Sequence, residues 1–147
     1  DAPSTSIYLQ TLGGYRTALR FPDLATIAGT GRALSKAELV IPVAGAYYPY
    51  YAPPAVLFLF REVNGADVFL PDQLNGISGI GGEFKSPEQA YRFNITRYVS
   101  QVLNGTLPGD GLALVAGSTG VSANRAVLCG PAHPDTPMRL LLTFTTY

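Results

Sequence analysis

Residues 36–43 read KAELVIPV, and this stretch decides the fold of the chain. Charged Lys36 and Glu38 alternate with apolar residues, which is the period of a β-strand with one face in a core and the other in solvent. The residues expected to face the core are Ala37, Leu39, Ile41 and Val43. A half-buried strand of this kind belongs to an antiparallel sheet that is packed on one side.

Short runs rich in Val, Ile, Leu, Thr, Tyr and Phe recur on both sides of this stretch, and 16 Gly and 12 Pro punctuate the chain. Many short strands with regular turn signals are typical of a β-sandwich or barrel. The strands expected are residues 6–12, 15–21, 36–43, 56–63, 90–95, 112–116, 125–129 and 138–147. At 147 residues the chain has the size of one domain, so we predict a single all-β domain over residues 1–147, an antiparallel, jelly-roll-like β-sandwich.

Two short helices are expected within the sandwich. Residues 22–27 begin with a proline and precede Gly29, which favours a single helical turn. Residues 96–103 form the second helix, because Asn94 or Thr96 can cap its start and Gly105 follows its end. Residues 44–54 and 70–88 are interpreted as long loops, and the GIGG sequence at residues 79–82 as a flexible turn.

The composition points to a protein whose surface is covered. Hydrophobic residues make up 47% of the chain and charged residues 14%, and ten basic residues balance ten acidic ones. A net charge of zero argues against nucleic-acid binding and against a polybasic membrane surface, and the hydrophobicity argues against disorder. Residues 55–60, AVLFLF, are apolar throughout, which fits a central strand covered on both faces or one face covered by a partner.

The residues that carry chemistry in other proteins form no recognisable constellation here, so we expect neither an enzyme nor a cofactor. The single histidine, His133, lies in a turn, and the single cysteine, Cys129, is interpreted as a buried hydrophobe rather than a reactive thiol. No apolar run is long enough to span a membrane. A structural calcium ion would need acidic loop residues to converge; the candidates are Asp67, Asp72, Glu83 and Asp110.

A tyrosine cluster stands out in the first long loop, where residues 47–51 read YYPYY. Aromatic rings on a loop can fold back as a lid, contact a partner protein or stack on sugar rings, and all three readings stay open. The candidate contacts with a partner or glycan are Tyr47, Tyr48, Tyr50 and Tyr51.

Both terminal segments are candidates for assembly through strand pairing. Residues 1–12 are interpreted as an N-terminal arm that could exchange between copies, and residues 138–147 as an apolar last strand. An exposed apolar edge strand aggregates in a free monomer, and assembly converts that hazard into a binding mode. The candidate assembly residues are Ile7, Tyr8, Leu9, Leu140, Leu142 and Phe144.

Four stretches in order carry a resemblance to a known family. They read YLQTLGGYRT at residues 8–17, LSKAELVIPV at 34–43, YRFNITRY at 91–98 and ANRAVLCGP at 123–131. Over nearly the whole chain they resemble the C-terminal domain of an uncharacterised family of Bacteroidota surface lipoproteins. More distantly, the Ala37-x-Leu39-x-Ile41 strand, followed by Phe93-x-Ile95-Thr96, resembles the carbohydrate-binding-like jelly rolls called DNRLRE. The chain holds no lipid-anchoring cysteine like that of the family, which leaves open whether it is cut from a longer lipoprotein.

The resemblance implies an extracellular, non-catalytic β-sandwich at the cell surface, and it carries over no site residue. Together with the covered surface, it leads us to expect a structural subunit of a surface filament or layer that associates with itself or with other surface proteins. The alternative is a carbohydrate-binding module of a surface lipoprotein that uses the tyrosine loop to hold a polysaccharide. The sequence does not distinguish a partner copy, another subunit and a glycan.

Overall fold

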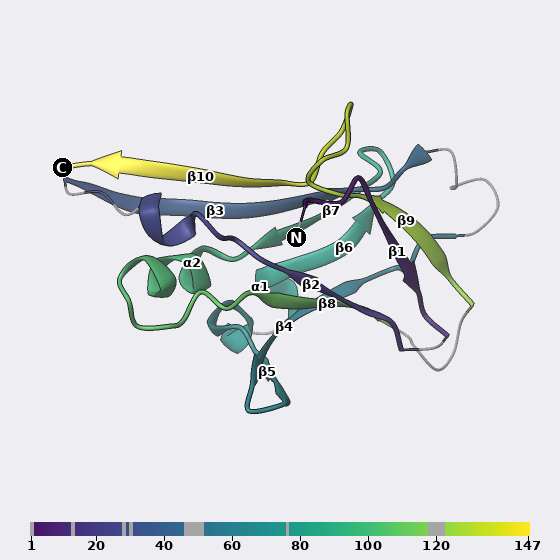
Figure 1. Ribbon diagram of the computed structural model, residues 1–147, viewed down its shortest axis with the longest axis horizontal. Coiled ribbons are helices and arrows are strands. Elements are labelled where there is room, and N and C mark those ends of the chain that lie inside the picture. The colour runs from purple at the N-terminus through teal and green to yellow at the C-terminus, as the bar shows by residue number, and fades with distance from the viewer. Residues whose placement is uncertain are drawn as a thin grey trace.

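The computed structural model describes residues 2–12, 14–27, 29, 31–45, 52–75, 77–117 and 123–147. The described chain is mostly β, with all paired strands antiparallel, and the predicted all-β sandwich is confirmed (Figure 1). The strands are β1 (Ser6–Gln10), β2 (Arg16–Leu19), β3 (Arg32–Pro42), β4 (Leu57–Val63), β5 (Ala66–Phe69), β6 (Gly81–Lys85), β7 (Ala90–Asn94), β8 (Leu112–Ala116), β9 (Arg125–Cys129) and β10 (Arg139–Thr146). The helices are the 3₁₀ turns η1 (Leu24–Ile27) and η3 (Pro71–Asn75), the short α1 (Ile77–Ile80) and α2 (Thr96–Leu103).

The strands form two four-stranded sheets and one strand pair. One sheet has the order β10-β3-β7-β6, the other β2-β8-β4-β5, and β1 pairs with β9. Two isolated bridges join these units: Val56 with Glu83 links the start of β4 to β6, and Val43 with Leu128 links the end of β3 to β9. The core lies between the two larger sheets, with the β1–β9 pair and α2 toward opposite ends (Figure 1).

The alternation that predicted β3 is confirmed by burial. Ala37, Leu39 and Ile41 are at most 1% exposed, as expected for the inward face. Leu39 lies opposite Leu140 on one side and Phe93 on the other, so the centre of the sheet is apolar across three strands. The apolar run in β4 divides in the same way: Leu57 and Leu59 are fully buried, while Phe58 and Phe60 on the opposite face are half-buried.

The helix α2 begins where it was predicted, but its cap comes from elsewhere in the chain. The Asp72 carboxylate, in η3, accepts hydrogen bonds from the backbone N–H groups of Arg97 at 2.8 Å and Tyr98 at 2.9 Å. A carboxylate at this end of a helix satisfies free N–H groups and is stabilised by the helix dipole. The predicted Asn94 contributes through its Oδ1, which accepts from the Thr96 N–H at 3.2 Å and from the Thr96 hydroxyl at 2.6 Å. That hydroxyl in turn accepts from the Ala37 N–H at 2.9 Å and ties α2 to β3.

The interpretation of residues 70–88 as one long loop is wrong. They contain η3, α1 and strand β6, and GIGG at 79–82 spans the end of α1 and the start of β6 instead of forming a free turn. Gly82 has a φ of 97°, and a Cβ there would lie 2.4 Å from the Leu57 carbonyl oxygen and 2.6 Å from a Phe93 ring carbon. The glycine therefore allows β6 to approach β4 and β7 closely, which a side chain would prevent. The sequence pattern also did not predict strand β5 at residues 66–69.

Candidate functional site

The last strand, β10, is the outermost strand of its sheet. It pairs with β3 from Arg139 opposite Val40 to Thr146 opposite Arg32, with a register shift between Thr143 and Phe144. Figure 1 shows β10 and β3 running together as a long ribbon to the end of the molecule where the C-terminus lies. An outermost strand leaves one row of backbone groups directed away from its own sheet, and such a row can pair with another strand.

The three candidate residues of β10 share the inward face. Leu140 and Leu142 are half-buried against the core, and Phe144, further along the ribbon, lies under the Arg32 guanidinium with its ring centroid 4.4 Å from the carbon of that group. Leu141 is on the opposite face and is 42% exposed. Both faces of this edge strand therefore present apolar side chains, with the outward one open to solvent.

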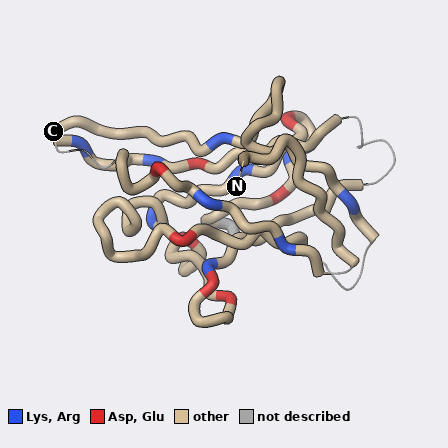
Figure 2. Tube along the Cα trace, viewed as in Figure 1, with Lys and Arg blue, Asp and Glu red and all other residues tan. Residues whose placement is uncertain are grey.

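Charge does little to protect the edge of β10. Residues 140–146 read LLLTFTT, with neither a charged residue nor a proline, and the tube of β10 is tan over most of its length in Figure 2. Many natural edge strands carry inward charges, lysine or proline, because these block pairing with other chains. An irregularity in the pairing also discourages edge pairing, and β10 has one, the register shift between Thr143 and Phe144. This edge is suited to receive a strand from another chain.

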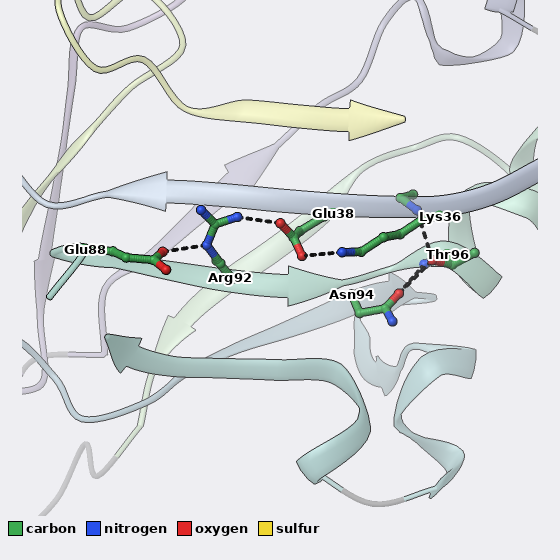
Figure 3. Close-up of polar contacts among 7 residues, drawn as sticks. Lys36, Glu38, Glu88, Arg92, Asn94 and Thr96 are labelled. Carbon is green, nitrogen blue, oxygen red and sulfur yellow. Dashed lines mark hydrogen bonds and ion pairs between the residues drawn. The ribbon is translucent and has the colours of Figure 1, made fainter. Parts of the chain in front are cut away.

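The outer face of β3 and β7, beside β10, carries a row of linked charges (Figure 3). Arg92 bridges two carboxylates: its Nε donates to Glu88 at 2.6 Å, and its Nη1 donates to Glu38. Glu38 is paired in turn with Lys36, whose Nζ lies 3.0 Å from Oε2. Burial alone would raise the pKa of Glu38, but the hydrogen bonds from Lys36 and Arg92 outweigh it and hold that pKa below its ordinary value.

The N-terminal candidates lie in a strand that pairs within its own chain. Strand β1 is antiparallel to β9, with Ile7 opposite Leu128 and Leu9 opposite Ala126. Ile7 and Leu9 are buried in the core, at 7% and 2% exposure, whereas Tyr8 between them is 69% exposed. Exchange of residues 1–12 between copies stays a prediction, and it would require this pairing to break and re-form with a neighbour.

A cavity of about 410 Å³ lies beside the β1–β9 pair. The residues that line it are Tyr8, Leu9, Gln10, Tyr15, Arg125, Ala126 and Val127. Of these, Tyr8 and Leu9 are also candidate assembly residues, and the sequence alone does not indicate the cavity. The signal available was weak, because Tyr15 follows a glycine pair that marks a turn and Arg125 opens a strand more than 100 positions away.

The tyrosines Tyr47, Tyr48, Tyr50 and Tyr51 lie outside the described residues. Two hydrogen bonds hold the segment that follows them. The Tyr91 hydroxyl donates to the Pro54 carbonyl at 2.6 Å, and the Asn124 side-chain amide donates to the Pro53 carbonyl at 3.2 Å. Residues 53 and 54 are thus tied to β7 and to the residue before β9.

Three of the four acidic residues considered for calcium have separate engagements. Asp67 pairs with Arg16, Asp72 caps α2, and Glu83 pairs with Lys85 at 3.2 Å. Across the described ranges, no group of three or more His, Cys, Asp or Glu side chains is arranged to hold a metal ion. Cys129 is buried, as expected, and its Sγ lies 3.3 Å from the Thr136 hydroxyl.

Within the described part of the chain, no helix combines the length and apolar character needed to cross a membrane. Comparison of the chain with protein-family models, with curated proteins and with solved structures finds no match. The fold itself defines the class of the protein: a mostly β, antiparallel sandwich with an apolar edge strand. The resemblance to surface lipoproteins stays a prediction.

Proposed function

We propose that this protein is a non-enzymatic structural subunit of an extracellular, cell-surface filament or layer, and that copies assemble by strand pairing along β10. The observation that carries the proposal is the outermost position of β10, together with its uncharged sequence after Arg139. An eight-residue strand offers a row of main-chain hydrogen bonds to a partner strand, and such bonds provide affinity in β-strand addition.

The side chains of β10 favour assembly over a free edge. Leu141 keeps 42% of its surface exposed, and covering it removes apolar area from water, worth about 25 cal/mol for each Å² buried. The chain as a whole has a net charge of zero, so copies do not repel one another through net charge. Low charge and an exposed apolar edge promote aggregation of a free monomer, but they allow a subunit to associate with its neighbours.

The position of the ribbon fits a repeating contact. In Figure 1 the C-terminal end of β10 and the β1–β9 pair lie toward opposite ends of the long axis. If β10 of one copy pairs with a different edge of the next, such as the predicted exchanging strand β1, the contact is heterologous and repeats into a filament. Pairing of β10 with β10 would instead close a two-fold dimer.

The test replaces an outward side chain of β10 and compares it with a matched apolar residue elsewhere. Leu141→Lys places a charge on the edge strand at an exposed position, so the fold should survive while assembly is lost. Leu74→Lys in η3 is the control, because Leu74 is 78% exposed and lies outside the strands. Electron microscopy and sedimentation velocity over a concentration series measure assembly, and circular dichroism confirms the fold.

The proposal expects fibres or sheets from the native protein and from Leu74→Lys, and monomers from Leu141→Lys. Monomers of the native protein at every concentration would contradict it. Equal loss of assembly in both variants would also contradict the proposal, since the association would then depend on nonspecific hydrophobic contacts rather than on pairing along β10. The alternative carbohydrate-binding function through residues 47–51 concerns a segment outside the described residues, so no described contact favours it.

A further inference from the structure

The cavity beside β1 and β9 is built by two segments that are far apart in the sequence. The register places Tyr8 opposite Val127 and Gln10 opposite Arg125. Alternate residues of a strand share a face, so these four lie on one face of the strand pair, and the buried Ile7 belongs to the other. Tyr15, just before β2, adds a second ring to the lining.

The lining combines aromatic rings with hydrogen-bonding groups. Tyr8 and Tyr15 are 69% and 65% exposed, so their rings are accessible although each is a large apolar surface. The Gln10 side chain brings both an amide donor and a carbonyl acceptor, and the tyrosine hydroxyls can do either. A volume of about 410 Å³ lies within the range of roughly 300–1,000 Å³ that small-ligand sites occupy.

Sugars match this combination. A pyranose ring has an apolar face of C–H bonds that stacks on an aromatic ring, and hydroxyls at its rim that need donors and acceptors together. Arg125 is the charged residue among the described residues of the lining, and its positive charge favours an anionic ligand. A guanidinium matches the planar geometry of a carboxylate and can bind it through two parallel hydrogen bonds.

We propose that this cavity binds an acidic oligosaccharide, one containing uronic acid residues, by stacking a sugar ring on Tyr8 and Tyr15 and directing a carboxylate to Arg125. The site lies on β1, β9 and the approach to β2, and uses no residue of β10. It therefore does not rest on the proposed assembly function, because a subunit binds the glycan as a monomer.

The experiment uses isothermal titration calorimetry of the full chain with a panel of oligosaccharides of galacturonic, glucuronic, mannuronic and guluronic acid, each compared with its neutral methyl ester. We expect at least one acidic member to bind and its ester to bind about tenfold more weakly or worse. Tyr8→Ala and Tyr15→Ala should each weaken binding by about tenfold, whereas Tyr8→Phe, which keeps the ring, should retain most of it.

Two further variants separate the charge from the fold. Arg125→Gln should bring the affinities for the acid and its ester close together, because the carboxylate loses its cationic partner. Tyr147→Ala is the matched control, since Tyr147 is 89% exposed outside the cavity, and it should bind as the native protein does. Absence of binding to every acidic member, or binding unchanged by Tyr8→Ala and Tyr15→Ala, would overturn the proposal. Equal binding of acids and esters by the native protein would refute the role of Arg125.

Discussion

Replacement of Tyr91 by phenylalanine removes one oxygen atom and tests how the segment after the tyrosine cluster is held. Tyr91 is fully buried in β7, and its hydroxyl donates to the Pro54 carbonyl at 2.6 Å. Pro54 is itself buried, so the variant leaves a carbonyl without this donor and out of reach of bulk water. A buried group that loses its partner costs about 1–3 kcal/mol.

Tyr98 provides the matched control for this substitution. It is 1% exposed in α2, but its hydroxyl has no hydrogen-bond partner of normal geometry within the described residues. Burial raises its pKa, while the Arg61 charge and a weak contact with the Gly111 backbone N–H lower it. Tyr98→Phe deletes the same atom from an equally buried site without breaking a hydrogen bond of normal geometry. Its free energy of unfolding should therefore stay within about 0.5 kcal/mol of the native value, or rise.

Urea denaturation and thermal melting followed by circular dichroism measure both variants. For a domain of this size each 1 kcal/mol lowers the melting temperature by about 2–4 °C, so Tyr91→Phe should melt clearly below Tyr98→Phe. Equal losses in the two variants would refute the reasoning, because burial rather than the bond to Pro54 would then explain the cost. A greater loss of stability in Tyr98→Phe than in Tyr91→Phe would also refute it.

Three further substitutions follow from described contacts. Glu38→Gln should reduce the loss of folding stability below about pH 4.5, measured by urea unfolding at a series of pH values. The folded state lowers the pKa of Glu38, so this residue stabilises the fold above the ordinary pKa of 4.5, and that stabilisation disappears as the pH falls through the lowered pKa. An unchanged dependence of stability on pH would contradict this. His133→Ala should lower the free energy of unfolding by about 1 kcal/mol in denaturant, because Nδ1 accepts hydrogen bonds from the N–H groups of residues 135 and 136. His133→Asn should lose less stability, because its side-chain oxygen can accept in the same way. Equal losses in the two variants would show that these hydrogen bonds do not stabilise the fold. Gly82→Ala should destabilise the fold by about 2 kcal/mol or more in thermal melts, since the new Cβ would clash with the Leu57 carbonyl. Gly65→Ala should cost less, because Gly65 also has a positive φ but no atom lies near its Cβ position. The reverse order of the two losses would refute the close approach of β6.

Strands with a strong local pattern could be predicted to the residue. Residues 112–116 and 125–129 match β8 and β9 because each is a compact apolar run bounded by turn residues. The phase of β3 also followed from its sequence, since charged and apolar residues alternate from Lys36 to Leu39 before the apolar Val40 breaks the pattern. Val40 is 2% exposed although it lies on the outer face, opposite Arg139 of β10, so its burial depends on neighbours that the local pattern does not show.

The missed elements lack a local signal. Every residue of β5 is exposed, so no alternation of buried and exposed positions marks it as a strand. Strand β6 depends on glycines that permit close approach to Leu57 and Phe93, and in the sequence these glycines resemble a turn. The cap of α2 comes from Asp72, 24 positions before the first residue of the helix, and no local motif reports it.

The candidate sites differ in the same way. Leu140, Leu142 and Phe144 could be placed on one face of β10 because period-two alternation is local. The cavity could not be anticipated, because Tyr8 and Arg125 meet only when β1 pairs with β9 in the observed register. Long-range pairing sets which residues become neighbours, and a single sequence does not display it.

Hydrogen exchange of the β10 amides, compared between dilute monomer and concentrated protein, tests the central claim most directly. The account predicts that amides of β10 directed away from β3 exchange freely in the monomer and become protected on assembly, while Leu141→Lys leaves them unprotected at both concentrations. Assembly without any gain of protection in β10, or assembly that Leu141→Lys leaves intact, would contradict the assignment of this edge as the contact between subunits.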